Sequence, residues 1–191
     1  MKALVCRAIS EDISTVRVED LPVREPGPGE VRLRIRAASV NFPDILMIQG
    51  KYQHKPPLPF TPGMEGAGEV VAVGEDVTRF RAGDRVVGGL RTGGFAEEAV
   101  AAEGALRAMP KGMDFAAAAA FPAAYLTAYV ALVRRVAIET GETLLVHGAA
   151  GGVGLAAVDL GLAFGARVIA TASSEEKRAF LAARGAHLVL P

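Results

Sequence analysis

The segment that most constrains the fold is the glycine-rich stretch at residues 142–157. An apolar run of strand length, Leu144–His147, leads into a turn, and an apolar helical pattern follows directly. Within the turn, Ala149, Gly151 and Gly154 have the spacing of a dinucleotide-binding fingerprint whose first glycine is replaced by alanine. Gly151 has no Cβ, so a pyrophosphate can approach the backbone there. The free N–H groups at the start of the helix then face that pyrophosphate. The predicted contacts are Ala150, Gly151, Gly152, Val153 and Gly154; the alternative is a structural glycine-rich turn.

The segments around this turn alternate between strand and helix patterns. After the first strand we expect a helix at Gly152–Ala163, a strand at Arg167–Thr171, a helix at about Ser174–Ala183 and a strand at Ala186–Leu190. This β-α-β-α-β order is half of a doubly wound parallel sheet. A complete dinucleotide fold adds three further strands beside the first one. We therefore expect this chain to be a fragment, or to receive its remaining strands from elsewhere.

The first half of the chain has the short apolar runs and Gly/Pro turns of β-structure, typical of a small barrel or sandwich. The expected strands are Lys2–Arg7, Thr15–Asp20, Val31–Ala37, Gly66–Val73, Asp84–Gly88 and Gly94–Val100. Val31–Ala37 alternates strictly, which predicts a solvated face for Arg32, Arg34 and Arg36. A short helix is expected within 41–50, where Asp44 suits the first turn.

Composition changes near Gly112, where an alanine-rich apolar stretch begins. Helices are expected at Phe115–Ala120 and Ala123–Val136, with a break at Phe121-Pro122 because the residue before proline is biased away from helix. We interpret this stretch as buried helices rather than a membrane span. The predicted domains are 1–121 and 122–191.

Charge and cysteine content exclude several classes of function. The 21 basic and 21 acidic residues balance and form no basic run, so neither nucleic-acid nor membrane binding is expected. The single cysteine, Cys6, excludes an internal disulfide and a cysteine-rich zinc site. A reducing, cytoplasmic setting is the expectation.

A series of motifs occurs in an order that resembles a known family. These are Asn41–Asp44, Pro62–Val71, Ala82–Val86, Gly94–Glu98, Tyr125–Tyr129 and His147–Gly154. They resemble the medium-chain dehydrogenase/reductase superfamily, and within it the zinc-independent quinone oxidoreductase branch that includes ζ-crystallin. The resemblance implies an α/β protein with a β-rich GroES-like catalytic domain, then the first half of a Rossmann domain, with a cleft between them.

The resemblance also implies a reaction, namely NADPH-dependent reduction of quinones or α,β-unsaturated carbonyls by hydride transfer. Full-length members continue past Pro191 and usually form homodimers. One alternative is an enoyl-thioester reductase of the same superfamily. A second, for the fragment, is a cofactor-binding module without turnover.

Zinc-dependent relatives hold a catalytic metal with a Cys near position 41 and a His within Gly-His-Glu. This chain has Asn41 and Met64 there, and thioethers and amides are poor zinc ligands, so no catalytic metal is expected. Hydrogen-bond donors must then stabilise charge on the substrate oxygen. The resemblance places Tyr52 and Asn41 at the cleft, with Tyr52 beside the cofactor. The alternatives are a helix-capping role for Asn41 and a loop aromatic for Tyr52; Glu65 is assigned no chemistry.

Cofactor choice depends on the end of the second strand of the doubly wound sheet. NAD-binding folds usually place an acidic residue there for the ribose 2′-OH, whereas this chain has Ala172-Ser173-Ser174. Ser173, Ser174 and Lys177 suit a 2′-phosphate, which predicts NADP(H). Two alternatives remain: Ser173 with Glu176 forms a capping box, or Glu175 is a displaced ribose ligand.

One further contact comes from the helix that precedes the fingerprint. The resemblance places Thr127 near the nicotinamide. The alternative is a helical threonine bonded to its own backbone.

Overall fold

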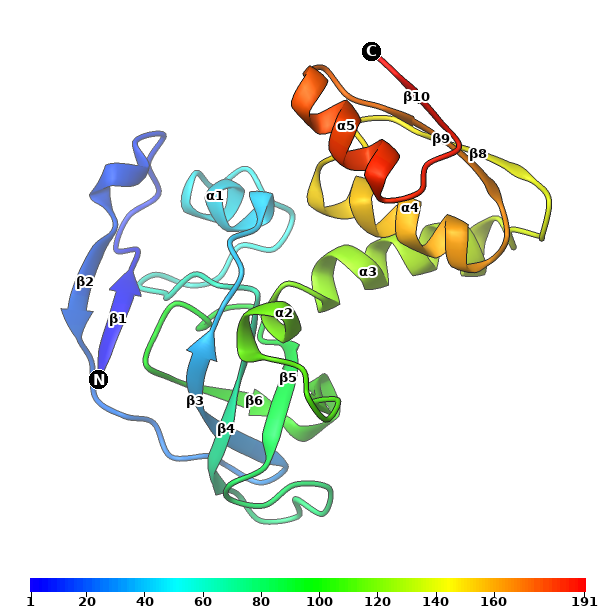
Figure 1. Ribbon diagram of the computed structural model, residues 1–191. Coiled ribbons are helices and arrows are strands. Elements are labelled where there is room, and N and C mark those ends of the chain that lie inside the picture. The colour runs from blue at the N-terminus through cyan, green and yellow to red at the C-terminus, as the bar shows by residue number, and fades with distance from the viewer. The chain divides into compact units, whose positions relative to one another are not determined.

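The computed structural model describes residues 1–191 and divides into two compact units, Met1–Pro122 and Ala123–Pro191 (Figure 1). Each unit has hydrophobic clusters of its own. No helix is both long enough and apolar enough to cross a membrane.

A five-stranded antiparallel sheet in the order β6-β3-β4-β5-β7 forms the centre of the first unit. Its strands are β3 (Glu30–Ala37), β4 (Glu65–Val73), β5 (Arg85–Gly89), β6 (Glu98–Ala102) and β7 (Leu106–Ala108). The inward side chains, Val31, Leu33, Val70, Val86 and Leu106 among them, build one core. Alternation therefore predicted the buried face of β3 correctly.

One prediction about this sheet is wrong, and one of its strands was missed. The strand expected at Gly94–Val100 begins only at Glu98, because Gly94 and Phe95 donate their N–H groups to Gly63 and Pro62 in a loop, at 3.0 Å each. The three-residue strand β7 was not predicted.

Arg32 also departs from expectation. Its side chain is only 18% exposed and pairs with Glu25 at 2.6 Å and with Glu98 at 3.4 Å. Arg34 and Arg36 are about half exposed. The outer face of β3 therefore carries ion pairs, and a solvated face describes it only in part.

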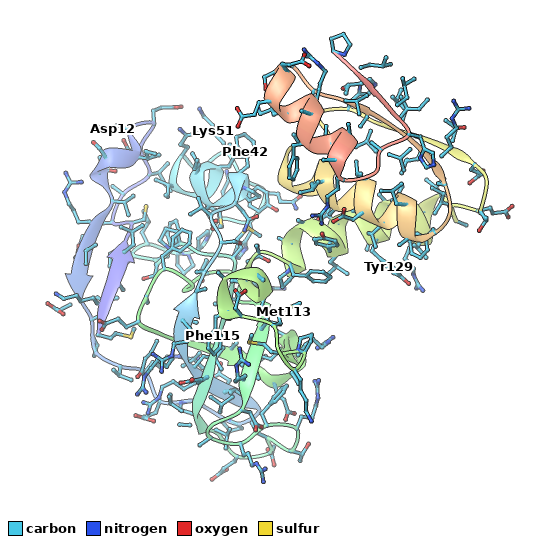
Figure 2. The ribbon with its side chains drawn as sticks, in the orientation of Figure 1. Asp12, Phe42, Lys51, Met113, Phe115 and Tyr129 are labelled. Carbon is cyan, nitrogen blue, oxygen red and sulfur yellow. The ribbon has the colours of Figure 1, made fainter.

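The remaining elements of the first unit surround this sheet. They are β1 (Lys2–Val5), η1 (Ile13–Thr15), β2 (Arg17–Asp20), α1 (Phe42–Ile48), η2 (Glu103–Ala105) and α2 (Phe115–Ala119). Strands β1 and β2 pair with each other, and Asp12 caps η1 (Figure 2). Helix α2 packs on β3 and β4, and the Arg85 guanidinium lies 4.5 Å from the centre of the Phe115 ring.

The second unit is a parallel three-stranded sheet in the order β10-β9-β8. Its elements are β8 (Thr143–Val146), α4 (Gly152–Ala163), β9 (Arg167–Thr171), α5 (Glu175–Ala183) and β10 (Leu188–Leu190). Helices α4 and α5 cover one face, where Val158 and Leu181 pack with Val168. This is the half of a doubly wound sheet that the glycine-rich stretch predicts.

Helix α3 (Pro122–Tyr129) precedes this sheet and continues as a π-helical segment, η3 (Val130–Arg135). The expected burial of this stretch is correct only in part: Ala128 and Leu132 are buried, whereas Leu126 is 63% exposed and Tyr129 41% exposed. Ala137, whose φ is +55°, follows the π-helical turn.

Candidate functional site

The turn between β8 and α4 presents backbone donors to solvent. Gly148 has a φ of +59°, and Gly151 is the N-cap of α4 without a side-chain cap. The N–H groups of Gly152, Val153 and Gly154 donate to no acceptor in the chain, and Gly151–Val153 is exposed. Three unpaired donors at the positive end of a twelve-residue helix suit an anion.

Two glycines set the position of α4, and the sequence identified only one of them. A Cβ on Gly154 would lie 2.6 Å from the carbonyl oxygen of Gly148 and 2.8 Å from Cα of Ala149, so this glycine lets the helix start close to its own turn. The close approach to the sheet occurs at Gly161, where a Cβ would lie 2.6 Å from Leu144 Cδ2.

The same turn is fastened to the end of β9. The N–H of Ala149 donates to the Thr171 carbonyl at 3.0 Å, and that of Gly148 to Thr171 Oγ1 at 3.3 Å. The fingerprint therefore lies beside the carboxyl end of β9, just before Ser173.

The N-terminus of α5 follows directly. Ser174 is its N-cap, and its Oγ accepts from the Lys177 N–H at 3.3 Å. The alternative of a capping box between Ser173 and Glu176 is therefore wrong, because the N-cap is Ser174. Ser173 is exposed beside the cap.

The two cationic side chains of this turn, Lys177 and Arg178, differ in their interactions within the chain. Arg178 donates to the carbonyls of Ala172 and Ser173 at 3.0 and 3.2 Å, and to Glu175 at 2.7 Å. Glu175 is thus occupied by an ion pair within the chain. Lys177 is exposed and forms no ion pair with another side chain.

Helix α3 is joined to α4 by a three-residue network. The Tyr125 hydroxyl donates to Asp159 Oδ2 at 2.5 Å, and Arg184 holds the same carboxylate with two bonds of 2.7 and 2.6 Å. Arg184 lowers the pKa of Asp159 most, and the bond to Asp159 raises the pKa of Tyr125. Thr127 is exposed on this helix.

In the first unit, the start of α1 contains a buried carboxylate. Asp44 is 1% exposed and accepts from the N–H groups of Asn41 at 2.8 Å and Gly63 at 3.0 Å. Burial raises the pKa of Asp44, the backbone donors oppose that shift, and the charge of Glu65 adds to it. The expected first-turn position of Asp44 is confirmed.

A second buried carboxylate, Glu65, lies at the start of β4 and is 2% exposed. Its Oε1 accepts from the Ser39 hydroxyl and, at 2.8 Å, from Nδ2 of Asn41. Nδ2 also donates to Ser39 Oγ at 3.0 Å. The sequence offered no signal for this network, because Ser39 and Glu65 are 26 residues apart.

Tyr52 is tied to the other end of α1, since its N–H donates to the Leu46 carbonyl at 3.2 Å. Its half-buried ring packs against a cluster that contains Met47 and Phe60, and its hydroxyl has no hydrogen-bond partner in the chain. Helix α1 therefore holds both Asn41 and Tyr52.

No group of three or more His, Cys, Asp or Glu side chains converges to form a metal site. The Met64 side chain packs against the apolar cluster that contains Met47 and Phe60. His187 Nδ1 instead accepts from the Val168 N–H at 3.1 Å.

Comparison with known proteins identifies relatives over both units. Residues 27–111 match the alcohol dehydrogenase GroES-like domain. Quinone oxidoreductase-like protein 2 of Mus musculus is 41% identical over 186 residues, which cover 97% of this chain and 52% of the mouse protein. The chain spans about half the length of the curated relatives it matches.

Solved structures agree with the sequence matches. The quinone oxidoreductase of Thermus thermophilus, also solved in complex with NADPH, is 40% identical with a TM-score of 0.87, and the match covers 99% of this chain and 59% of that one. The CurK enoyl reductase is 31% identical with a TM-score of 0.90, over 98% of this chain and 59% of that one. The chain belongs to the medium-chain dehydrogenase/reductase superfamily, and within it to the proteins related to quinone oxidoreductase.

Proposed function

We propose that the full-length protein reduces quinones or α,β-unsaturated carbonyls by hydride transfer from NADPH. The observation that carries this proposal is the exposed start of α4, where three unpaired N–H groups lie in a turn fastened to the end of β9. These donors fit a pyrophosphate, and the predicted contacts at 150–154 are proposed to hold it. The bound nicotinamide supplies the hydride.

NADPH is proposed over NADH because of the groups that follow β9. No acidic residue stands at 172–174, and Glu175 already pairs with Arg178. Lys177 is exposed beside the hydroxyls of Ser173 and Ser174. One cation with two hydroxyls suits a 2′-phosphate better than a ribose diol.

The catalytic residues are proposed to come from α1 and its loop. Tyr52 offers a hydroxyl with no partner in the chain, which suits donation to the substrate oxygen as charge develops. Asn41 is proposed to contact the ligand, and Thr127 to approach the nicotinamide. We propose that no zinc takes part, because an amide and a partly buried thioether stand where the resemblance expects two of its ligands.

A second candidate function is enoyl-thioester reduction, which the similarity to the CurK enoyl reductase favours. The third, for the 191-residue chain, is cofactor binding without turnover. The proposed setting is cytoplasmic, and the full-length protein is proposed to be a homodimer, as the resemblance implies.

Single-turnover oxidation of NADPH by 1,4-benzoquinone tests the function with the full-length protein, against an enzyme-free blank. We expect NADPH consumption with the quinone, and slower consumption with crotonyl-CoA.

Tyr52→Phe should slow the chemical step by roughly 10²-fold, the scale for loss of one oxyanion donor, while the control Tyr129→Phe should not. Binding of NADPH without oxidation would exclude the enzymatic proposal, and preference for the thioester would favour the second candidate. One zinc per chain by elemental analysis would contradict the metal-free mechanism.

A further inference from the structure

The guanidinium of Arg178 connects the turn after β9 to the first residue of α5. Its Nη1 donates to the carbonyl oxygens of Ala172 at 3.0 Å and Ser173 at 3.2 Å. Its Nη2 donates to Oε2 of Glu175 at 2.7 Å. The Glu175 carboxylate is therefore separated from the backbone of this turn only by the guanidinium group.

A carboxylate beside this turn bears directly on the choice of cofactor. Dinucleotide-binding folds that take NAD place an acidic side chain near the end of this strand, where it holds the ribose 2′-OH. Residues 172–174 contain no acid, so Glu175 is the first acidic side chain after β9. A free carboxylate here would accept from a 2′-hydroxyl and repel a 2′-phosphate.

The ion pair that holds this carboxylate has a fixed partner. Exposed ion pairs usually contribute little, because two long side chains lose conformational freedom when they meet. The Arg178 side chain is only 24% exposed and is already held by two backbone carbonyls. Pairing therefore restricts only Glu175, whose side chain is 88% exposed, and forms at a lower entropic cost than a typical surface pair.

We propose that Arg178 is a positioning residue that sets the preference for NADPH by holding Glu175. The guanidinium balances the charge of the carboxylate, so Ser173 and Lys177 meet the 2′-phosphate without a competing anion. Removal of the guanidinium releases Glu175 to accept from the 2′-hydroxyl of NADH. This inference rests on the proposed function and identifies the residue of its cofactor site that discriminates against NADH.

The ratio of the NADH and NADPH dissociation constants measures this discrimination, by fluorescence titration of the full-length protein. Arg178→Leu should lower the preference for NADPH by roughly five- to tenfold, because NADPH binds more weakly and NADH more tightly. Arg178→Lys keeps a cation three residues after Glu175 and should retain most of the preference.

A second substitution separates this role from support of the turn. Arg178→Leu also removes the two bonds to backbone carbonyls, and that loss alone would weaken both cofactors equally. The double variant Arg178→Leu/Glu175→Gln releases no carboxylate, so its preference should return to within about twofold of wild type. Glu176→Gln is the matched control, because Glu176 lies in the same first turn and forms no ion pair with Arg178. In the Arg178→Leu background it should restore nothing.

Glu175→Gln alone tests the proposal even if Arg178→Leu does not fold. Because the carboxylate is already held in the wild type, this variant should bind NADH within about twofold of wild type. A tenfold loss of NADH binding would show that Glu175 is itself a ribose ligand and would overturn the proposal.

The remaining outcomes separate this inference from the proposed function. An unchanged ratio in Arg178→Leu, an equal loss for both cofactors, or an altered ratio that persists in the double variant would overturn the inference alone. A wild type that prefers NADH would overturn it together with the proposed cofactor. If the wild type binds neither cofactor, the proposed function is refuted and the inference with it.

Discussion

At the start of α5, two neighbouring cations have different tasks. Arg178 spans the carbonyls of Ala172 and Ser173 and the Glu175 carboxylate, so it holds the turn after β9 in place. Lys177 has no such partner, although its backbone N–H completes the cap with Ser174. A lysine beside a capped helix start is therefore available to an external anion.

Replacement of Lys177 by alanine should weaken NADPH binding and spare NADH. Loss of one charged hydrogen bond to the 2′-phosphate should cost about 1–3 kcal/mol. Fluorescence titration of both cofactors against the full-length protein measures this, with Lys111→Ala as the control for removal of one surface charge. An equal loss for NADH and NADPH would show that Lys177 does not contact the 2′-phosphate.

The contribution of the Tyr125 hydroxyl to stability can be tested with a single substitution. Tyr125→Phe removes the bond to Asp159 and should lower the free energy of unfolding by about 1–2 kcal/mol. Urea unfolding measures the difference, and Tyr129→Phe should leave stability unchanged, because Tyr129 is 41% exposed and makes no comparable bond. A neutral Tyr125→Phe would mean that Arg184 alone satisfies the carboxylate.

The same carboxylate predicts a pH dependence. Arg184 and Tyr125 lower the pKa of Asp159 in the folded chain, so its contribution to stability is complete above the unfolded pKa of about 3.9 and is lost as pH falls through the lower folded value. The difference in unfolding free energy between wild type and Asp159→Asn should therefore be constant from neutral pH to about 5. It should shrink below about pH 4. A difference that grows on acidification would contradict the assignment.

At the scale of elements, the position of α4 depends on glycine at two places, one beside its own turn and one against the sheet. Gly161→Ala should be destabilising by about 1–3 kcal/mol, because the new methyl overlaps Leu144 and outweighs the gain in helix propensity. Gly154→Ala should cost more, since it meets backbone atoms of Gly148 and Ala149, which cannot rotate away. Gly152→Ala is the control, with its nearest neighbour 3.9 Å away. Urea unfolding of the three variants should give this order, and equal stabilities would refute it.

The sequence could predict those elements whose residue pattern is contained within the element itself. The bounds of α4 and β9 match the expected ranges, because an apolar period and glycines at the ends define them. Strand β7 could not be predicted, since its three residues become a strand only by pairing with β5. The segment before Glu98 has an apolar pattern, yet the N–H groups of Gly94 and Phe95 donate to the loop at 62–63 and that of Glu97 donates to Lys2.

The candidate site divides in the same way. The glycine-rich turn and the hydroxyls after β9 each lie within one short segment, so the sequence could predict where they stand in the fold. The Ser39–Asn41–Glu65 network joins residues 26 apart, and the Tyr125–Asp159–Arg184 network joins residues 34 and 25 apart. No sequence spacing predicts either network, because only the tertiary fold brings these side chains together.

At the scale of the whole molecule, one face of the second sheet is uncovered. Leu145 on β8 is 51% exposed, and Leu188 and Leu190 on β10 are 42% and 40% exposed. These side chains lie opposite the face that α4 and α5 cover. Apolar residues gathered on a sheet face with an unpaired edge strand favour association.

The isolated 191-residue chain should therefore self-associate as its concentration rises. Leu145→Lys should reduce this association, with little effect on unfolding free energy because the side chain is already half exposed. Light scattering over a dilution series measures it, and Ile13→Lys, at a site 47% exposed in η1, is the matched control. Equal effects of both substitutions would show that general charge, and not this face, governs association.

The division into two units has a consequence for how the chain is made. Every strand of the five-stranded sheet lies within residues 30–108, and the first unit ends at Pro122, 69 residues before Pro191. At about 5–20 residues per second, a ribosome takes roughly 3–14 s to add those residues. Pairing of β3 with β6 joins residues about 70 apart, a slow closure for a β-protein, yet milliseconds to seconds suffice. The strands of the five-stranded sheet thus have time to pair during synthesis, before β10 has been added.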